Sequence, residues 1–380
     1  MRYSYSEFDG QEFPTPESLF NYSNIFDFIL TYGEQALEAM DKLKPADEHI
    51  LQELIESGLL EKAAGRFRLT PRAINAMQKK ALMEIFANLP RGSRDSHPTT
   101  STGNGSDRLE GTKKYQFGDP ISELDMTSTL RNAIQRISAS GVPVGLPINI
   151  KESDMDLHLL ESTTNCALCI LIDMSGSMRR YGRFLAAKKV AMALTALVRE
   201  RFPQDTVDLV GFYTTAIPVR ETQLPLLMPK PVSTYEYEVD VTLPLADAAQ
   251  THQHFTNLQL GMQMARRLLS ARSAQQKIMF IITDGQPTAH VDGETLHLHY
   301  PPRKITTMAT LREGLQCTRA GVRVASFALI EDYWDMEWVE FIDQLTRLCK
   351  GTAFYCTGEN LASCVMESYL SGKKRKTYIA

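Results

Sequence analysis

Apolar residues follow two periods in the second half of the chain. Short, nearly continuous apolar runs predict buried strands at Ala167–Ile172, Val207–Tyr213, Lys277–Thr283, Val322–Leu329 and Ala353–Cys356. Longer stretches with an apolar residue every three or four positions predict helices at 180–201, 257–270, 305–320, 336–350 and 360–370. Buried strands that alternate with amphipathic helices predict an α/β fold with a doubly wound, mainly parallel sheet over residues 164–371.

The first ninety residues have a mostly helical pattern and are predicted to form a small separate domain. Helical periodicity covers about 23–43 and 47–56, and residues 59–69 predict a hairpin that turns at Gly65. Thr70 and Pro71 then begin a further helix, with Thr70 as its N-cap. This order resembles part of a winged-helix module. Because no helix rich in base-reading side chains precedes the hairpin, a protein-contacting or packing role is favoured over DNA binding.

Three further segments complete the expected organisation. Residues 91–118 are rich in Ser, Thr, Gly, Asn and Pro without periodicity, which predicts a flexible linker. Residues 119–163 predict a lead-in segment with a helix at about 128–138, and residues 372–380 predict a basic tail.

Charge and cysteine usage narrow the class of protein. The net charge of −4 argues against a dominant nucleic-acid role. The N-terminus lacks the apolar core of a signal peptide, and no apolar run approaches the ~20 residues that span a bilayer, so a cytoplasmic protein without membrane contact is expected. Cys166 and Cys169 lie in one predicted strand and point to opposite faces, which favours buried packing over redox or zinc chemistry.

Oxygen-bearing side chains gather at the predicted carboxyl ends of strands. Asp173, Ser175 and Ser177 follow the first strand, Asp284 follows another, and Thr256 stands where a helix begins. Loops at these ends meet on one edge of a parallel sheet. Oxygen ligands without His or Cys suit Mg²⁺, with Mn²⁺ and Ca²⁺ as alternatives. Two carboxylates and three neutral hydroxyls leave the shell incomplete, so water or an anionic ligand from a partner must complete it.

These segments resemble a known metal site. D-M-S-G-S-M, T-N-L-x-x-G-M-x-x-A-R-x-L-L and I-I-T-D-G-Q-P-T resemble the metal-ion-dependent adhesion site of von Willebrand factor A domains. The resemblance implies that Ser175 and Ser177 bind the metal directly, that Thr256 binds directly or through water, and that Asp173 and Asp284 act through water. Thr251 is the alternative for the threonine ligand; the helix that starts after Thr256 favours Thr256.

A narrower resemblance covers more of the chain. Y-Q-F-G-D-P, L-H-L-L-E-S-T-T-N-C-A-L-C-I-L-I-D-M-S-G-S-M and T-D-G-Q-P-T-A-H are similar to CoxE-like proteins, which accompany MoxR-type AAA+ ATPases. This implies an adaptor in protein assembly, activation or metal insertion. The sequence has no G-x-x-x-x-G-K-[ST], so a separate AAA+ ATPase is expected to supply ATP-driven work.

The remaining features leave alternatives open. His290, His297 and His299 are expected on a solvated loop, with a second metal site or a switch as the alternative. The long loop 218–255 is either a partner surface or a plain insertion, and Tyr333, Trp334 and Trp338 either pack or anchor a partner. The favoured function is a non-enzymatic, Mg²⁺-dependent adaptor that accepts a Glu or Asp from a protein partner. The alternatives are a DNA-binding regulator and a metal-dependent hydrolase.

Overall fold

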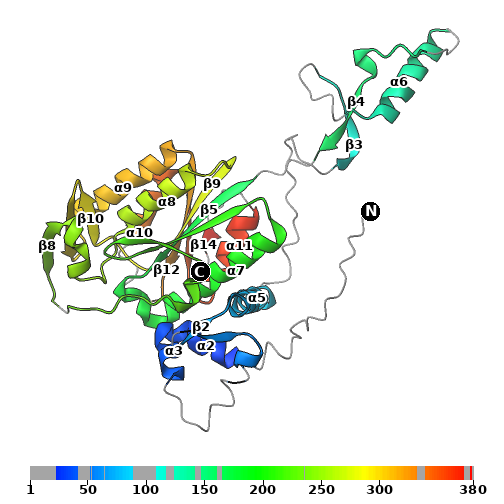
Figure 1. The fold of residues 1–380 in the computed structure, drawn as a ribbon. Coiled ribbons are helices and arrows are strands. Elements are labelled where there is room, and N and C mark those ends of the chain that lie inside the picture. Colours follow the sequence, from blue (N-terminus) through cyan, green and yellow to red (C-terminus); the bar gives the residue numbers. More distant parts are fainter. Residues whose placement is uncertain are drawn as a thin grey trace. The chain divides into compact units, whose positions relative to one another are not determined.

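The computed structural model of the chain (Figure 1) describes most of the residues after 165 and several segments before them. The described residues are 23–41, 52, 54–63, 65–88, 108–116, 124–141, 147–160, 165–234, 236–331, 339–371 and 377–378. Those before 95 and after 165 belong to one compact unit, and those between 96 and 165 form a second unit.

A twisted sheet forms the centre of the first unit (Figure 1). Among the described residues its strands lie in the order β14-β13-β12-β9-β5-β6-β7. Every neighbouring pair is parallel except β6 and β7, which are antiparallel. The strands are β5 (Cys166–Asp173), β6 (Thr206–Phe212), β7 (Ala216–Val219), β9 (Gln276–Thr283), β12 (Val322–Leu329), β13 (Thr352–Cys356) and β14 (Thr377–Tyr378).

Helices cover both faces of this sheet. One face carries α7 (Arg183–Arg201) and α11 (Leu361–Ser371), and the other carries α8 (Leu258–Ser270), α9 (Lys304–Arg319) and α10 (Val339–Cys349). All eight residues of β5 are buried, and alternate side chains enter two different cores. Leu168 and Ile170 join the core under α7, whereas Cys169 and Leu171 join the core under α8. The doubly wound α/β prediction is therefore confirmed.

The cysteines lie inside these cores. All six are free thiols and all are buried. Burial raises the pKa of Cys166 to about 12, which keeps the thiol protonated and unreactive at neutral pH. The expectation of buried packing for the C-x-x-C pair matches this structure.

A small antiparallel sheet lies in a region that the sequence was expected to leave as loops. Strand β8 (Val239–Pro244) pairs with β11 (Thr295–Tyr300), which pairs with β10 (Ala289–Asp292). One face of this sheet contributes a third, separate apolar cluster that includes Ala289, Leu296 and Leu298. The expectation of a solvated loop for the histidines at 290, 297 and 299 is therefore wrong: they stand on strands, and His290 and His299 are buried.

The N-terminal elements pack against α7. They are α2 (Ser23–Tyr32), α3 (Glu34–Met40), the hairpin β1 (Leu60–Ala63) and β2 (Arg66–Leu69), and α5 (Pro71–Asn88). Thr70 accepts from the Ala73 N–H at 3.2 Å, so it caps α5 as predicted. Apolar side chains of these elements share one continuous core with α7. The N-terminal region is thus helical with one hairpin, as expected, and is docked on the α/β domain.

A buried lysine reinforces this docking. Lys188 of α7 is fully buried, and its ammonium donates to the carbonyls of Leu30 (2.7 Å) and Pro225 (3.0 Å). Burial lowers the pKa of Lys188 to about 7.

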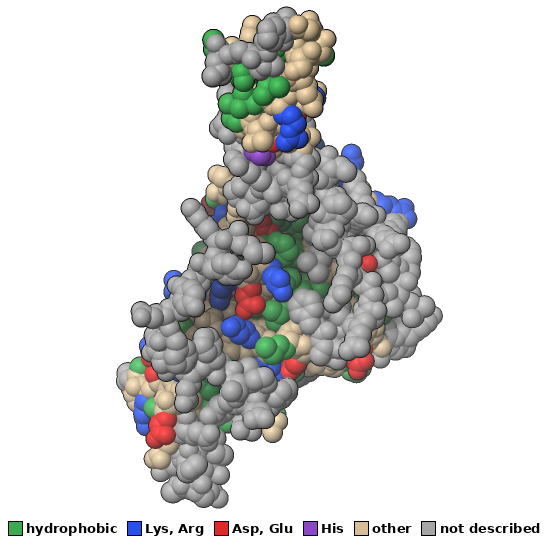
Figure 2. All heavy atoms as spheres, turned by 90° about the vertical axis from the view of Figure 1, so that its right-hand side faces the viewer, with side chains coloured by type: hydrophobic (Ala, Val, Ile, Leu, Met, Phe, Trp, Pro, Cys, Tyr) green, Lys and Arg blue, Asp and Glu red, His purple; other side chains and the backbone are tan. Residues whose placement is uncertain are grey.

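On the face shown in Figure 2, the described acidic and basic side chains are interspersed, so this face carries no broad basic patch among its described residues.

The second unit contains β3 (Arg108–Lys114), β4 (Asp156–Leu160), α6 (Met126–Ala139) and the short 3₁₀ turn η3 (Glu152–Asp154). β3 and β4 pair antiparallel, and Asp125 caps α6. Arg136 holds Asp154 with two hydrogen bonds, Nε to Oδ1 at 2.9 Å and Nη2 to Oδ2 at 2.8 Å. Strand β3 lies within residues 91–118, so the linker prediction is wrong for Arg108–Lys114. The strand was missed because its charged sequence R-L-E-G-T-K-K lacks apolar alternation.

Several predictions fall outside the described residues. These are most of the linker, residues 47–51 and 53 of the predicted helix 47–56, the aromatic group Tyr333, Trp334 and Trp338, and the basic run at 373–376. Within the predicted tail, Thr377 and Tyr378 form β14 at the edge of the sheet.

Candidate functional site

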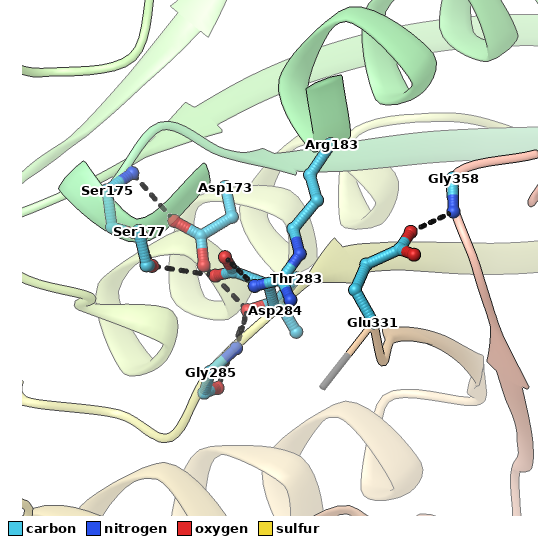
Figure 3. A network of polar contacts seen from close by, with 9 residues as sticks. All are labelled: Asp173, Ser175, Ser177, Arg183, Thr283, Asp284, Gly285, Glu331 and Gly358. Atoms are coloured by element: carbon cyan, nitrogen blue, oxygen red, sulfur yellow. Dashed lines mark hydrogen bonds and ion pairs between the residues drawn. The ribbon is translucent and has the colours of Figure 1, made fainter. Parts of the chain in front are cut away.

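Asp173 ends β5 at the carboxyl edge of the sheet and is fully buried. Its Oδ1 accepts from the Ser175 N–H at 2.8 Å, and its Oδ2 accepts from the Thr283 hydroxyl at 2.6 Å. Thr283 ends β9, the neighbouring strand, so this bond ties two loops that are 110 residues apart in the sequence. Figure 3 shows these groups converging at the edge of the sheet.

Two serine hydroxyls continue this cluster. Ser175 Oγ lies 3.1 Å from Ser177 Oγ, and Ser177 Oγ donates to Asp284 Oδ1 at 2.8 Å. A hydroxyl that gives its proton to a carboxylate turns its lone pairs elsewhere, toward the space that a cation would occupy. The structure thus brings together four of the five predicted metal residues: Asp173, Ser175, Ser177 and Asp284.

Arg183 is a member of the cluster that sequence reasoning missed. Its Nη1 lies 2.9 Å from Asp284 Oδ2, and both side chains are buried, at 3% and 0% exposure. Arg183 is the first residue of α7, so the guanidinium reaches back from the helix start to the end of β9 (Figure 3). In the sequence, Arg183 is a basic residue shortly after the metal segment, and no spacing rule predicts which residue it contacts.

The cluster places two acidic side chains close together in a buried position. Burial raises the pKa of Asp173 to about 7, and the nearby Asp284 carboxylate raises it too. The hydrogen bonds from Thr283 and Ser175 act in the opposite direction. Two buried carboxylates at one point repel each other, and Arg183 compensates only one of them. A cation placed between the carboxylates and the serine hydroxyls would relieve this repulsion.

The donor set fits Mg²⁺. Carboxylate and hydroxyl oxygens are the ligands that hard divalent cations prefer, and no nitrogen or sulfur ligand belongs to the hydrogen-bonded group of Asp173, Ser175, Ser177 and Asp284. Thr283 would hold Asp173 in place, and Arg183 would hold Asp284.

Thr256 stands immediately before Asn257, which caps α8 through a bond from the Leu260 N–H. The Thr256 side chain is buried, and its backbone is tied to the next strand: its N–H donates to Thr288 Oγ1, and its carbonyl accepts from the Thr288 N–H. These backbone bonds run toward β10 and not toward Asp173. Thr251 lies further away in sequence from α8, at the end of a 3₁₀ turn, and is half-buried. The role of Thr256 as a ligand stays a prediction.

A segment of the long loop 218–255 packs over the metal loop. The Lys230 N–H donates to the Met174 carbonyl at 2.8 Å, and the Gly176 N–H donates to the His254 carbonyl at 3.0 Å. A Cβ on Gly176 would lie 2.6 Å from Val232 Cγ2, so glycine is required here by close approach rather than by backbone freedom. This segment therefore frames the site.

The comparison with known proteins decides the family. Residues 166–370 match the family described as "Rv0959-like protein, vWA domain", and residues 107–158 match its "third domain". The first match covers more than half of the chain. The chain belongs to the Rv0959-like family with a von Willebrand factor A domain. The A domain comprises β5 to α11 of the first unit, and the second unit corresponds to the third domain.

Relatives of this A-domain chain include the uncharacterized protein Rv0959 of Mycobacterium tuberculosis and the uncharacterized protein Mb0984 of Mycobacterium bovis. Each is 29% identical over 331 residues, covering 85% of this chain and 44% of the relative. The chain therefore spans less than half the length of these relatives.

Solved structures similar to the A domain include the vWF domain of the type V pili tip protein Mfa5 from Porphyromonas gingivalis. That match has a TM-score of 0.38 and 12% identity, over 57% of this chain and 98% of that one. BatB from Bacteroides thetaiotaomicron matches with a TM-score of 0.36 and 12% identity, over 55% and 98%. Within the described part of the chain, no helix combines the length and apolarity that crossing a membrane requires.

Proposed function

We propose that this protein is an intracellular, Mg²⁺-dependent docking adaptor whose A domain binds an acidic side chain of a protein partner through a metal at the Asp173–Asp284 cluster. The resident ion would supply an electrophilic contact point. Ser175 and Ser177 would hold it directly, and Asp173 and Asp284 would orient the serines and offset the charge.

The observation that carries this proposal is the charge of the cluster. With both carboxylates ionised, which a bound cation would favour, Asp173, Asp284 and Arg183 carry one net negative charge. A divalent cation would therefore give the cluster one net positive charge, in a place where burial makes unbalanced charge costly. An anionic ligand from outside the chain restores neutrality. Two carboxylates and a divalent metal alone would be neutral. Arg183 adds one positive charge, so the metal-bound site is better suited to docking a Glu or Asp.

The surroundings of the cluster suit a protein partner. Tyr181, in the 3₁₀ turn between Ser177 and α7, is 61% exposed and lies over the Arg183 guanidinium, 5.1 Å from Cζ to the ring centroid. Exposed tyrosines beside a charged contact are typical of binding surfaces.

The partner that we propose is a MoxR-type AAA+ ATPase or the protein on which it acts. The support is the similarity of the metal-loop region to CoxE-like proteins, together with the lack of G-x-x-x-x-G-K-[ST] in the sequence. ATP-driven work would then come from a separate chain.

Affinity capture tests this function. Immobilised wild-type protein and its Asp173→Asn variant are exposed to native lysate with Mg²⁺ or with EDTA, and bound proteins are identified. We expect a partner that binds the wild type in Mg²⁺ and is lost with EDTA and in the variant. Circular dichroism checks that the variant keeps its fold. A partner set that neither EDTA nor Asp173→Asn changes would contradict the metal bridge.

The same purified protein tests the two alternatives. Phosphatase turnover with Mg²⁺ or Mn²⁺ that disappears in Asp173→Asn would indicate a hydrolase instead of an adaptor. Salt-sensitive DNA binding by the full chain in a gel shift would indicate the DNA-binding regulator.

A further inference from the structure

The small antiparallel sheet gathers three histidines on one face. His290 of β10 stands directly opposite His297 of β11, and His299 follows two residues later on the same face of β11. Ala289, Leu296 and Leu298 are the sequence neighbours of these histidines. They point to the opposite face and belong to the separate apolar cluster. The strict alternation of T-L-H-L-H-Y therefore puts imidazoles on one side of the sheet and aliphatic side chains on the other.

The three imidazoles lie close enough to share one ligand. One ring nitrogen of each lies within 4.8 Å of a ring nitrogen of each of the other two. The ring centroids of His290 and His297 are 4.8 Å apart with the rings nearly parallel, and His299 lies 5.6 Å from His290 and 6.1 Å from His297. His290 and His299 are buried at 3% and 5% exposure, whereas His297 is half-buried.

Each imidazole also has an oxygen atom beside its Nδ1. His290 Nδ1 lies 3.1 Å from the Thr306 hydroxyl, and His297 Nδ1 lies 3.1 Å from the Thr242 hydroxyl. His299 Nδ1 lies 3.2 Å from Asp240 Oδ1 in a close polar contact. The strand register explains two of these contacts, because Thr242 stands opposite His297 and Asp240 stands opposite His299.

These oxygens lie where an Nδ1–H could donate to them. An Nδ1–H that donates to a hydroxyl or carboxylate leaves the Nε2 lone pair free for a metal, and such a partner orients metal-binding histidines. Asp240 is itself held by Arg303, whose Nη1 lies 2.7 Å from Asp240 Oδ2.

We propose that His290, His297 and His299 form a Zn²⁺ site, with the fourth position of the ion open to water. Three imidazole nitrogens suit zinc and not magnesium, so this site is distinct in chemistry from the Asp173–Asp284 cluster. Around tetrahedral Zn²⁺ with bonds of about 2.0–2.1 Å, ligand nitrogens lie about 3.3 Å apart. The rings must therefore converge by up to about 1.5 Å from the 4.8 Å limit seen here, a movement that side-chain rotation supplies.

Zinc at this place would join the two strands of one hairpin. The ligands come from β10 and β11, and their oxygen partners come from β8 and from Thr306 on α9. β10 is also joined to the start of α8, because the Ala289 N–H donates to the Thr256 carbonyl at 3.1 Å. The ion would cross-link the β10–β11 hairpin, so zinc should raise the melting temperature.

Equilibrium dialysis tests the zinc site. Full-length protein without a polyhistidine tag is stripped of metal and dialysed against submicromolar Zn²⁺ in excess Mg²⁺, and bound zinc is measured by mass spectrometry. His297→Ala is the test variant, because His297 is the least buried of the three. His254→Ala is the matched control, since His254 lies outside the cluster and contacts Ser233 and Phe255.

We expect one zinc per chain in the wild type and in His254→Ala, and a loss of affinity on the order of a hundredfold or more in His297→Ala. A wild type that binds no zinc, or a His297→Ala variant that binds it as tightly, would overturn the proposal. X-ray absorption of the zinc-loaded wild type decides the matter even if His297→Ala does not fold: three imidazoles around the ion support the site, and fewer overturn it.

Discussion

The oxygen cluster at the edge of the main sheet and the histidine cluster on the small sheet both gather polar side chains, but they differ in donor atom and in charge. The first buries two carboxyl groups, and Asp284 contacts the Arg183 guanidinium. The second gathers three imidazoles beside two hydroxyls and one carboxylate. The difference teaches that the donor atoms of the two regions would suit different ions, a hard one for oxygen and a borderline one for nitrogen.

The two clusters also differ in how the fold assembles them. Parallel strands bring Asp173 and Asp284 together although 110 residues separate them, because the carboxyl ends of neighbouring strands share an edge. A hairpin brings His290 and His297 together from seven residues apart. The edge site depends on the whole A domain, whereas the histidine site depends on one short sheet and its contacts with α9.

The largest expected effect is that each of two variants loses affinity for one metal and keeps its affinity for the other. Asp173→Asn should reduce Mg²⁺ or Mn²⁺ affinity on the order of a hundredfold or more, because the carboxamide carries no charge and cannot accept from both Ser175 and Thr283. Zinc binding should stay unchanged. His297→Ala should show the reverse. Calorimetric titration of both variants with both metals measures this, and a variant that loses both ions equally would break the comparison.

The second effect concerns stability at the edge. Arg183→Met leaves Asp284 buried without its partner, so it should lower the free energy of unfolding by about 3–5 kcal/mol in EDTA. Mg²⁺ should recover more of the melting temperature in this variant than in the wild type, because the ion then replaces the missing cation. Thermal melts with and without Mg²⁺ check it.

Lys79→Met is the control for that experiment. Lys79 forms an exposed pair with Glu200, with 56% and 45% of the side chains exposed, so its loss should change stability by about 0–1 kcal/mol. Equal destabilisation by the two variants would show that the Arg183 pair is not energetically special.

A smaller effect is expected at the oxygen that supports a histidine. Asp240→Asn removes the charge beside His299 and should weaken zinc binding by about tenfold to a hundredfold without touching a ligand. Dialysis against Zn²⁺ measures it. Mg²⁺ affinity serves as the internal control, and zinc affinity equal to that of the wild type would mean that Asp240 does not orient His299.

The smallest effect separates the two threonines. Thr256→Ala should weaken Mg²⁺ binding about tenfold if its hydroxyl reaches the ion, directly or through water, and Thr251→Ala should leave the affinity unchanged. The paired calorimetric titrations decide between them. A loss in Thr251→Ala alone would reverse the assignment.

The sequence predicted five of the seven described strands of the main sheet, without β7 and β14, and four residues that the structure brings together at the edge. Fully apolar runs such as the one in β5 are unambiguous because both faces of the strand are buried, and the Asp and Ser residues follow directly where the strand ends. The small sheet was missed because β10 and β11 are short and half polar. Gly293 lies between Asp292 and Glu294 in a tight hairpin turn and has a φ of 59°. The alternation of apolar and polar residues on either side of this glycine could have revealed the hairpin.

Two other features lay beyond sequence reasoning for a physical reason. Arg183 contacts Asp284 only because α7 starts where its first side chain can reach back to β9, and no local pattern encodes that distance. Gly176 is required by the approach of Val232, which comes from a loop more than fifty residues away. Both depend on tertiary packing.

The central claim is that the edge cluster holds a divalent ion with a coordination position open to an outside carboxylate. Water proton relaxation of Mn²⁺-loaded protein tests this most directly, because exchanging water on a bound Mn²⁺ speeds relaxation. We predict strong enhancement in the wild type, which falls as acetate or a glutamate-containing peptide replaces the water, and none in Asp173→Asn. Enhancement that is absent in the wild type, or equal in the variant, would contradict the account.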